Sequence, residues 1–231
     1  MIEPQNPFAN KELTTEERIV LKAEREANLE TEKNGGIPTK NCLMTLRQAY
    51  EDAGNDFKAA ETLEQQNEIY PNPEDYNLIG VYYHNSGNKD KAIEFFERAL
   101  EYNPNAYWPN FNLGNTLFYK DSQKSFKYLN KAYELNPSEP CVNILLGRLD
   151  KRGKYAEAKK KFQIAYDRYE QKWKANSLND SDYGWFASVA EELGKKDKAH
   201  EIRNSKPKIE QTLYYDEENL TQTRTKSLTK L

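Results

Sequence analysis

Between residues 73 and 106, hydrophobic and small residues recur at the spacing of two consecutive helices. The first stripe occupies positions i, i+3, i+4 and i+7 of one helix face: Tyr76, Ile79, Gly80 and Tyr83. A second stripe follows at Ala92, Phe96 and Ala99. The run Ser86-Gly87-Asn88 between them is a turn signal. The pattern predicts an antiparallel helix hairpin, with Gly80 and Ala92 where the two helices must approach closely.

Three prolines give this pattern a period along the chain. Pro71, Pro104 and Pro137 are spaced by 33 residues, and the last two lie in the similar contexts ALEYNPNA and AYELNPSE. A fixed period of this length indicates stacked structural units. Weaker copies of the two stripes precede residue 73 and follow residue 106, so we expect an array of hairpins.

The spacing of these residues closely resembles the tetratricopeptide repeat signature, whose unit is a 34-residue helix-turn-helix. The resemblance implies an all-α, right-handed superhelical solenoid of about five antiparallel hairpins. Its units cover the array at 40–72, 73–106, 107–139, 140–175 and 180–206. Arg47 replaces the small residue of the first unit, which argues against a tight helix crossing there. The fourth unit lacks its closing proline, so its second helix is expected to continue towards Trp173.

The two flanks of the array differ from it in pattern. Residues 1–39 contain the capping-box run Thr14-Thr15-Glu16-Glu17 and, after a charged amphipathic stretch, the stop signal Gly35-Gly36. This segment predicts one N-terminal helix that caps the first hairpin. Residues 207–231 are mostly polar with a few apolar residues, and we expect them to form a C-terminal tail.

Composition narrows the class of protein. Lys and Arg total 34 against 37 Asp and Glu, a net charge of -3, which lacks the basic excess of a dedicated nucleic-acid domain. No apolar run is long enough to span a bilayer, so membrane insertion is not expected. No secretory leader is recognisable, and Cys42 and Cys141 are interpreted as reduced thiols. These features predict a soluble, cytoplasmic protein.

The sequence offers little for catalysis. It has only two histidines, His84 and His200, and neither stands at a recognised triad or metal-ligand spacing from a Cys, Asp or Glu. Gly35-Gly36 lacks the pattern of a phosphate-binding loop. The lysine run 159–161 is interpreted as a solvated helix face, and the nearby aromatics Phe162, Tyr166 and Tyr169 as a core stripe. We therefore expect neither an enzyme nor a bound cofactor or metal.

The resemblance also implies a binding surface, because the first helix of each hairpin lines the concave side in this family. Carried over position by position, the candidate peptide-binding residues are Asn77, Trp108, Phe111, Asn112, Asn115, Phe118, Tyr119, Arg148, Lys151 and Arg152. The rings of the third unit would form an exposed apolar patch, typical of a binding site. The basic residues one unit further on would suit an acidic portion of the partner.

The family resemblance and the candidate binding surface predict two alternative functions. The first is an adaptor that holds a peptide or protein segment in the concave groove. The alternative is a structural subunit of a large assembly, held through its outer helix faces and C-terminal tail. The groove could be filled by a partner, by the chain's own tail, or by a neighbouring subunit, and the sequence leaves these occupants open.

Overall fold

The computed structural model describes residues 13–150 and 155–206 of the chain, and within these residues every regular element is a helix. The prediction of an all-α fold is confirmed. The chain divides into two compact units, Met1–Leu149 and Asp150–Leu231, and each is described by itself.

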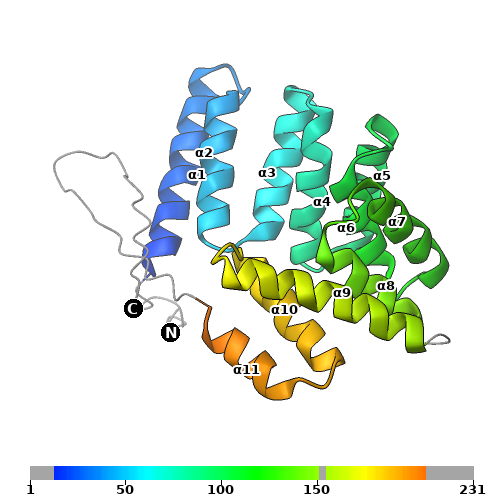
Figure 1. The fold of residues 1–231 in the computed structure, drawn as a ribbon. Coiled ribbons are helices and arrows are strands. Elements are labelled where there is room, and N and C mark those ends of the chain that lie inside the picture. The colour runs from blue at the N-terminus through cyan, green and yellow to red at the C-terminus, as the bar shows by residue number, and fades with distance from the viewer. Residues whose placement is uncertain (1–12, 151–154, 207–231) are drawn as a thin grey trace, which may run out of the picture. The chain divides into compact units, whose positions relative to one another are not determined.

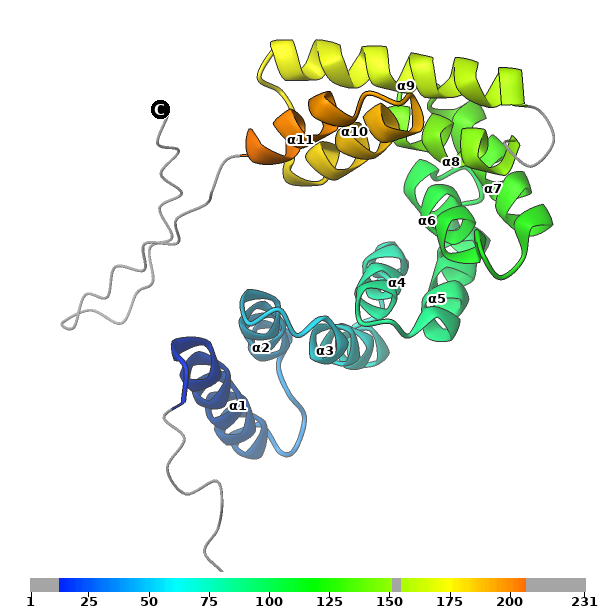
Figure 2. The same cartoon turned by 90° about the horizontal axis from the view of Figure 1, so that it is seen from below.

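The first unit is a succession of antiparallel helices (Figure 1). In chain order they are α1 (Thr15–Lys33), α2 (Lys40–Asp52), α3 (Asp56–Ile69), the 3₁₀ turn η1 (Pro73–Asp75), α4 (Tyr76–Asn85), α5 (Lys89–Tyr102), α6 (Tyr107–Leu117), α7 (Ser122–Leu135) and α8 (Pro140–Asp150). Each of α2 to α7 packs against the helix that follows it or precedes it in sequence. Figure 2 shows α2, α4 and α6 along one side of this succession, with α3, α5 and α7 along the other.

Helix α1 begins and ends where the sequence predicts. Thr14 accepts a hydrogen bond from the Glu17 N–H at 3.1 Å, and Glu17 accepts one from the Thr14 N–H at 2.8 Å, which completes the capping box. The helix stops before Gly35 and Gly36, whose φ angles of +71° and +87° favour glycine. Its buried residues Ala23 and Ala27 are small and therefore permit close packing against α2.

Close helix approach inside the hairpins explains the small residues of the repeat. A Cβ atom added at Gly80 would lie 2.6 Å from two ring atoms of Phe96 on α5. A Cβ atom at Gly114 would lie 2.7 Å from Leu129 Cγ on α7. Real Cβ atoms do not come this close to other atoms. The predicted role of Gly80 is therefore confirmed, and Gly114 has the same role one repeat later.

The second hairpin holds the centre of a continuous apolar core. Tyr83, Phe95 and Phe96 are at most 1% exposed, and the rings of Tyr83 and Phe95 stack with centroids 5.7 Å apart. The Tyr83 hydroxyl donates to Glu64, and Lys91 Nζ lies 3.1 Å from the same carboxylate. The polar end of the buried tyrosine is therefore satisfied, as burial of a hydroxyl requires.

Helix α4 is preceded by a short 3₁₀ turn, and Arg47 of α2 reaches α4. Pro73 begins the 3₁₀ turn η1, and α4 starts at Tyr76. Arg47 does not prevent α2 from packing against α3. Its guanidinium bonds Glu51 of the same helix and the Tyr82 hydroxyl of α4.

The second unit consists of α9 (Tyr155–Lys174), α10 (Asp180–Glu192) and α11 (Lys196–Asn204). The long α9 agrees with the expected continuation towards Trp173. Phe186 of α10 is 0% exposed, and the rings of Tyr166, Tyr169 and Trp173 lie 5.3 to 6.0 Å from it, centroid to centroid. Phe162, Tyr166 and Tyr169 are at most 4% exposed and are thus core residues, as the sequence predicts.

Candidate functional site

The side of α4 that turns away from its own hairpin carries an exposed apolar residue. Gly80 faces Phe96 of α5, and at 100° per residue Leu78 lies about 160° round the helix from Gly80. Leu78 is accordingly 37% exposed. Neighbouring Asn77 lies about 60° from Gly80 and is half-buried. This places Leu78 on the surface and Asn77 on the flank next to it.

Helix α6 also carries exposed residues on the side that turns away from its own hairpin partner. Gly114 faces α7, and Trp108, Asn112 and Asn115 lie about 100° to 160° round the helix from it. Trp108 is 54% exposed, although such a large apolar side chain is usually buried. Tyr119, just beyond the helix end, is 84% exposed. The predicted exposure of Trp108 and Tyr119 is therefore correct.

The two helices are joined directly through polar side chains. Asn112 Nδ2 donates to Asn77 Oδ1 at 3.1 Å, and His84 Nδ1 lies 2.9 Å from Thr116 Oγ1. The structure thus brings together two of the predicted site residues, Asn77 and Asn112. We refer to the five residues Asn77, Leu78, Trp108, Asn112 and Asn115 as the α4–α6 strip.

Two predicted site residues are not exposed. Phe111 and Phe118 are 6% and 7% exposed, which corrects the expectation that these rings form part of an open apolar patch. They lie about 60° and 40° from Gly114, the same angles at which Asn77 and His84 of α4 turn towards α6. Those two positions of the repeat form the junction between neighbouring first helices, and burial of large rings there is the natural result.

The three basic residues predicted for the site do not belong to the α4–α6 strip. Arg148, in the last turn of α8, is partly buried and already takes part in an interaction. Lys151 and Arg152 lie outside the described residues. The described part of the predicted site therefore consists mainly of amide and apolar side chains.

A polar contact that sequence reasoning missed joins α2 to α4. Tyr82 is 8% exposed, its hydroxyl donates to Glu51, and Arg47 Nη1 donates to the same hydroxyl at 3.1 Å. Burial and the neighbouring carboxylate raise the pKa of Tyr82 to about 12. The only sequence signal for this contact was Arg47, which stands at the repeat position that Gly80 and Gly114 occupy in the next two repeats.

Burial shifts the pKa values of the two thiols and of His84. Burial raises the pKa of the Cys42 thiol and that of Cys141, the latter to about 11, so both thiols are poor nucleophiles. Burial also lowers the pKa of His84, with a smaller contribution from Lys89. Within residues 13–150 and 155–206, no group of three His, Cys, Asp or Glu side chains could hold a metal ion.

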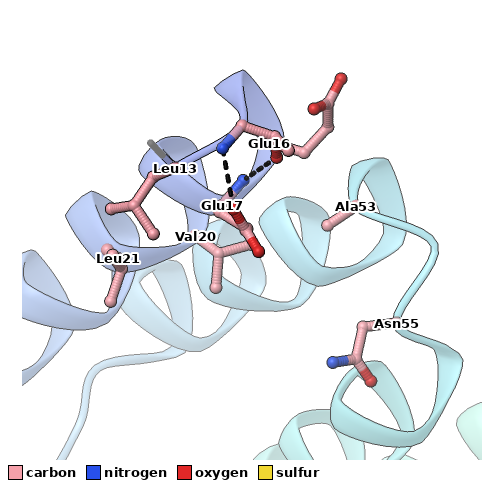
Figure 3. Close-up of a pocket in the computed structure, with 8 residues that line it drawn as sticks. Leu13, Glu16, Glu17, Val20, Leu21, Ala53 and Asn55 are labelled. Carbon is pink, nitrogen blue, oxygen red and sulfur yellow. Dashed lines mark hydrogen bonds between the residues drawn. The ribbon is translucent and has the colours of Figure 1, made fainter. Parts of the chain in front are cut away.

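A hollow of about 580 Å³ lies at the start of α1 (Figure 3). Its lining comprises Leu13, Thr14, Glu16, Glu17, Val20, Leu21, Ala53 and Asn55. Thr14 and Glu17 are engaged in the capping box there, as the dashed lines in the figure mark. None of the lining residues belongs to the α4–α6 strip.

Comparison with known proteins identifies the repeat. Residues 73–106 match the tetratricopeptide repeat family, which confirms the resemblance based on Gly80, Phe96 and Pro104. The matched segment is the hairpin of α4 and α5 together with its closing proline. The chain therefore carries a tetratricopeptide repeat within an all-α fold.

The fold is also found in solved structures of MamA. A MamA protein is 18% identical with a TM-score of 0.51 and covers 71% of this chain and 88% of its own. MamA 41-end from Desulfovibrio magneticus RS-1 is 16% identical with a TM-score of 0.52 and covers 71% of this chain and 91% of its own. At these identities the likeness concerns the fold alone. A search of curated proteins finds no match.

The tetratricopeptide repeat supports a role in protein–protein interaction, as an adaptor or a scaffold. In the described part of the chain, no helix combines the length and the apolar character needed to cross a membrane.

Proposed function

We propose that this protein is a non-catalytic, cytoplasmic adaptor that binds a peptide or protein segment along α4 and α6. The observation that carries the proposal is the exposure of Trp108 and Leu78 on the sides of these helices opposite their own hairpin partners. Large apolar side chains left exposed on neighbouring elements usually belong to binding surfaces, and tryptophan is enriched among residues that dominate binding energy.

The amide groups beside these side chains support the same function. Asn115 is half-buried and its side chain has no hydrogen-bond partner among the described residues. An amide both donates and accepts hydrogen bonds, so Asn115 suits the backbone of a bound segment. Apolar contacts would supply affinity, and the amides would fix the orientation of the segment.

The proposal predicts that Trp108→Ala combined with Leu78→Ala abolishes partner capture. Both side chains are exposed, so we expect the melting temperature to change little while the apolar contact area is lost. The measurement is affinity capture at native expression, with the co-eluting proteins quantified for the wild type and for the variant. Equal recovery of every partner by both proteins would contradict the proposal.

A second candidate function is that of a structural subunit held through other helix faces. It is favoured by Phe126 and Tyr133, which lie seven residues apart on α7 and are 42% and 39% exposed. The matched control Phe126→Ala/Tyr133→Ala separates the two functions in the same capture experiment. Loss of partners from this control, with none from the α4–α6 variant, would favour the structural subunit.

A further inference from the structure

The flank of α7 that turns away from α5 carries two exposed aromatic side chains. Leu129 of α7 faces α6. At 100° per residue, Phe126 and Tyr133 lie about 60° and 40° round the helix from Leu129 to one side, and Tyr128 lies about 100° round to the other. Tyr128 packs against the apolar core of the second hairpin. On the opposite flank, Phe126 is 42% exposed and Tyr133 is 39% exposed.

The same flank is covered on the two preceding second helices. The corresponding residues of α5, 33 positions earlier, are Ile93 and Leu100, and both are partly buried against the apolar core. On α3, another 33 positions earlier, they are Ala60 and Asn67, which are 0% and 8% exposed. This flank is therefore a helix-packing surface in the repeat. It stays exposed on α7, the last second helix of the first unit (Figure 2).

Polar residues beside the two rings form a pattern that is complementary to itself. Asn130 lies between the rings in sequence and is half-buried, and Lys127 and Glu134 are exposed. Lys127 and Glu134 are separated by seven positions, which is about 10.5 Å along a helix, too far for them to pair with each other. Neither forms an ion pair with another residue in the described part of the chain.

A second copy of α7 in antiparallel orientation would meet each of these residues with its complement. With Asn130 of the two copies opposite each other, Phe126 lies within about 1.5 Å of the level of the second copy's Tyr133, and Lys127 within about 1.5 Å of the level of its Glu134. The two amides can pair because each donates and accepts. A twofold axis repeats every other contact, as in an isologous interface.

We infer that this chain forms a twofold homodimer through the flank of α7 that contains Phe126, Asn130 and Tyr133. The inference goes beyond the proposed function and does not depend on what the α4–α6 strip binds. Packing covers the aromatic rings of both copies, and the ion pairs between Lys127 and Glu134 fix the antiparallel register. Only one helix of each copy takes part, so the interface is small and the dimer is reversible, with a Kd in the micromolar range.

Sedimentation equilibrium of the full chain over a wide range of concentration tests the inference. The wild type should pass from monomer to dimer as its concentration rises. Phe126→Ala/Tyr133→Ala removes four rings from the interface and should raise the Kd by at least about a hundredfold. The control Tyr102→Ala removes a 59% exposed ring from α5 and should leave the Kd unchanged. Equal dimerisation of the wild type and the α7 variant would overturn the inference.

Charge reversal tests the antiparallel register. Lys127→Glu creates two like-charge pairs across the twofold axis, as does Glu134→Lys, and each variant should raise the Kd by about tenfold. The double variant Lys127→Glu/Glu134→Lys restores both ion pairs and should return the Kd to within about twofold of the wild type. Both residues are exposed, so folding should be unaffected. Single variants without effect, or a double variant weaker than either single one, would overturn the inference.

Other occupants of the flank have distinct outcomes. A wild type that is monomeric at every concentration would overturn the inference, and loss of another protein from Phe126→Ala/Tyr133→Ala in affinity capture would then identify that protein as the occupant. Neither outcome bears on the proposed function, which Trp108→Ala/Leu78→Ala tests. A dimer that is lost in Trp108→Ala/Leu78→Ala and kept in the α7 variant would place a second copy on the α4–α6 strip and overturn the inference.

Discussion

Replacement of Phe96 by alanine is expected to lower the free energy of unfolding by about 3–5 kcal/mol. Phe96 is 1% exposed, and its ring lies against Gly80, so there is no side chain on that side to fill the space it leaves. The cost combines the lost transfer of a large apolar side chain with the cavity that remains. Urea denaturation followed by circular dichroism measures it.

The control for Phe96→Ala is the removal of an aromatic side chain that is exposed rather than buried. Tyr119 is 84% exposed, and Tyr119→Ala should change the free energy of unfolding by less than about 0.5 kcal/mol. If Phe96→Ala cost no more than Tyr119→Ala, the close contact between α4 and α5 described here would be wrong.

Alanine in place of glycine should have opposite effects at two helical positions. Gly80→Ala is expected to destabilise the protein by about 1–3 kcal/mol, because the added methyl overlaps the Phe96 ring and forces the two helices apart. This exceeds the roughly 1 kcal/mol gained from the better helix propensity of alanine.

Gly184 in α10 is the matched control for Gly80, because it is a helical glycine with open space around it. It is exposed, and a Cβ atom added there meets nothing within 4 Å. Gly184→Ala should therefore raise stability by about 0.5–1 kcal/mol through helix propensity alone. Thermal and urea denaturation of both variants test the pair, and a stabilising Gly80→Ala would contradict the packing of the repeat.

The repeat could be predicted from sequence because its packing constraints are local. Gly80 and Phe96 lie within one hairpin, and their spacing alone indicates which residues must be small and which must fill the core. Helix ends were predictable for the same reason, since the Thr14 capping box and the Gly35-Gly36 stop depend on neighbouring residues.

Contacts between successive hairpins were harder to predict. Phe111 and Phe118 were expected to be exposed on the concave side of the array. They instead occupy the two angular positions that face the next first helix of the array, where large rings become buried. The Asn77–Asn112 bond and the contact of Arg47 with Tyr82 likewise join residues about one repeat apart. Such pairs depend on the rotation between hairpins, which the spacing within one hairpin does not determine.

The most direct test of the binding face is a nuclear magnetic resonance titration of the chain with a partner recovered in the affinity capture. The account predicts that the largest shifts occur at the side-chain amides of Asn77, Asn112 and Asn115 and at the indole N–H of Trp108. Shifts confined to α5 and α7, or to the indoles of Trp173 and Trp185, would contradict it.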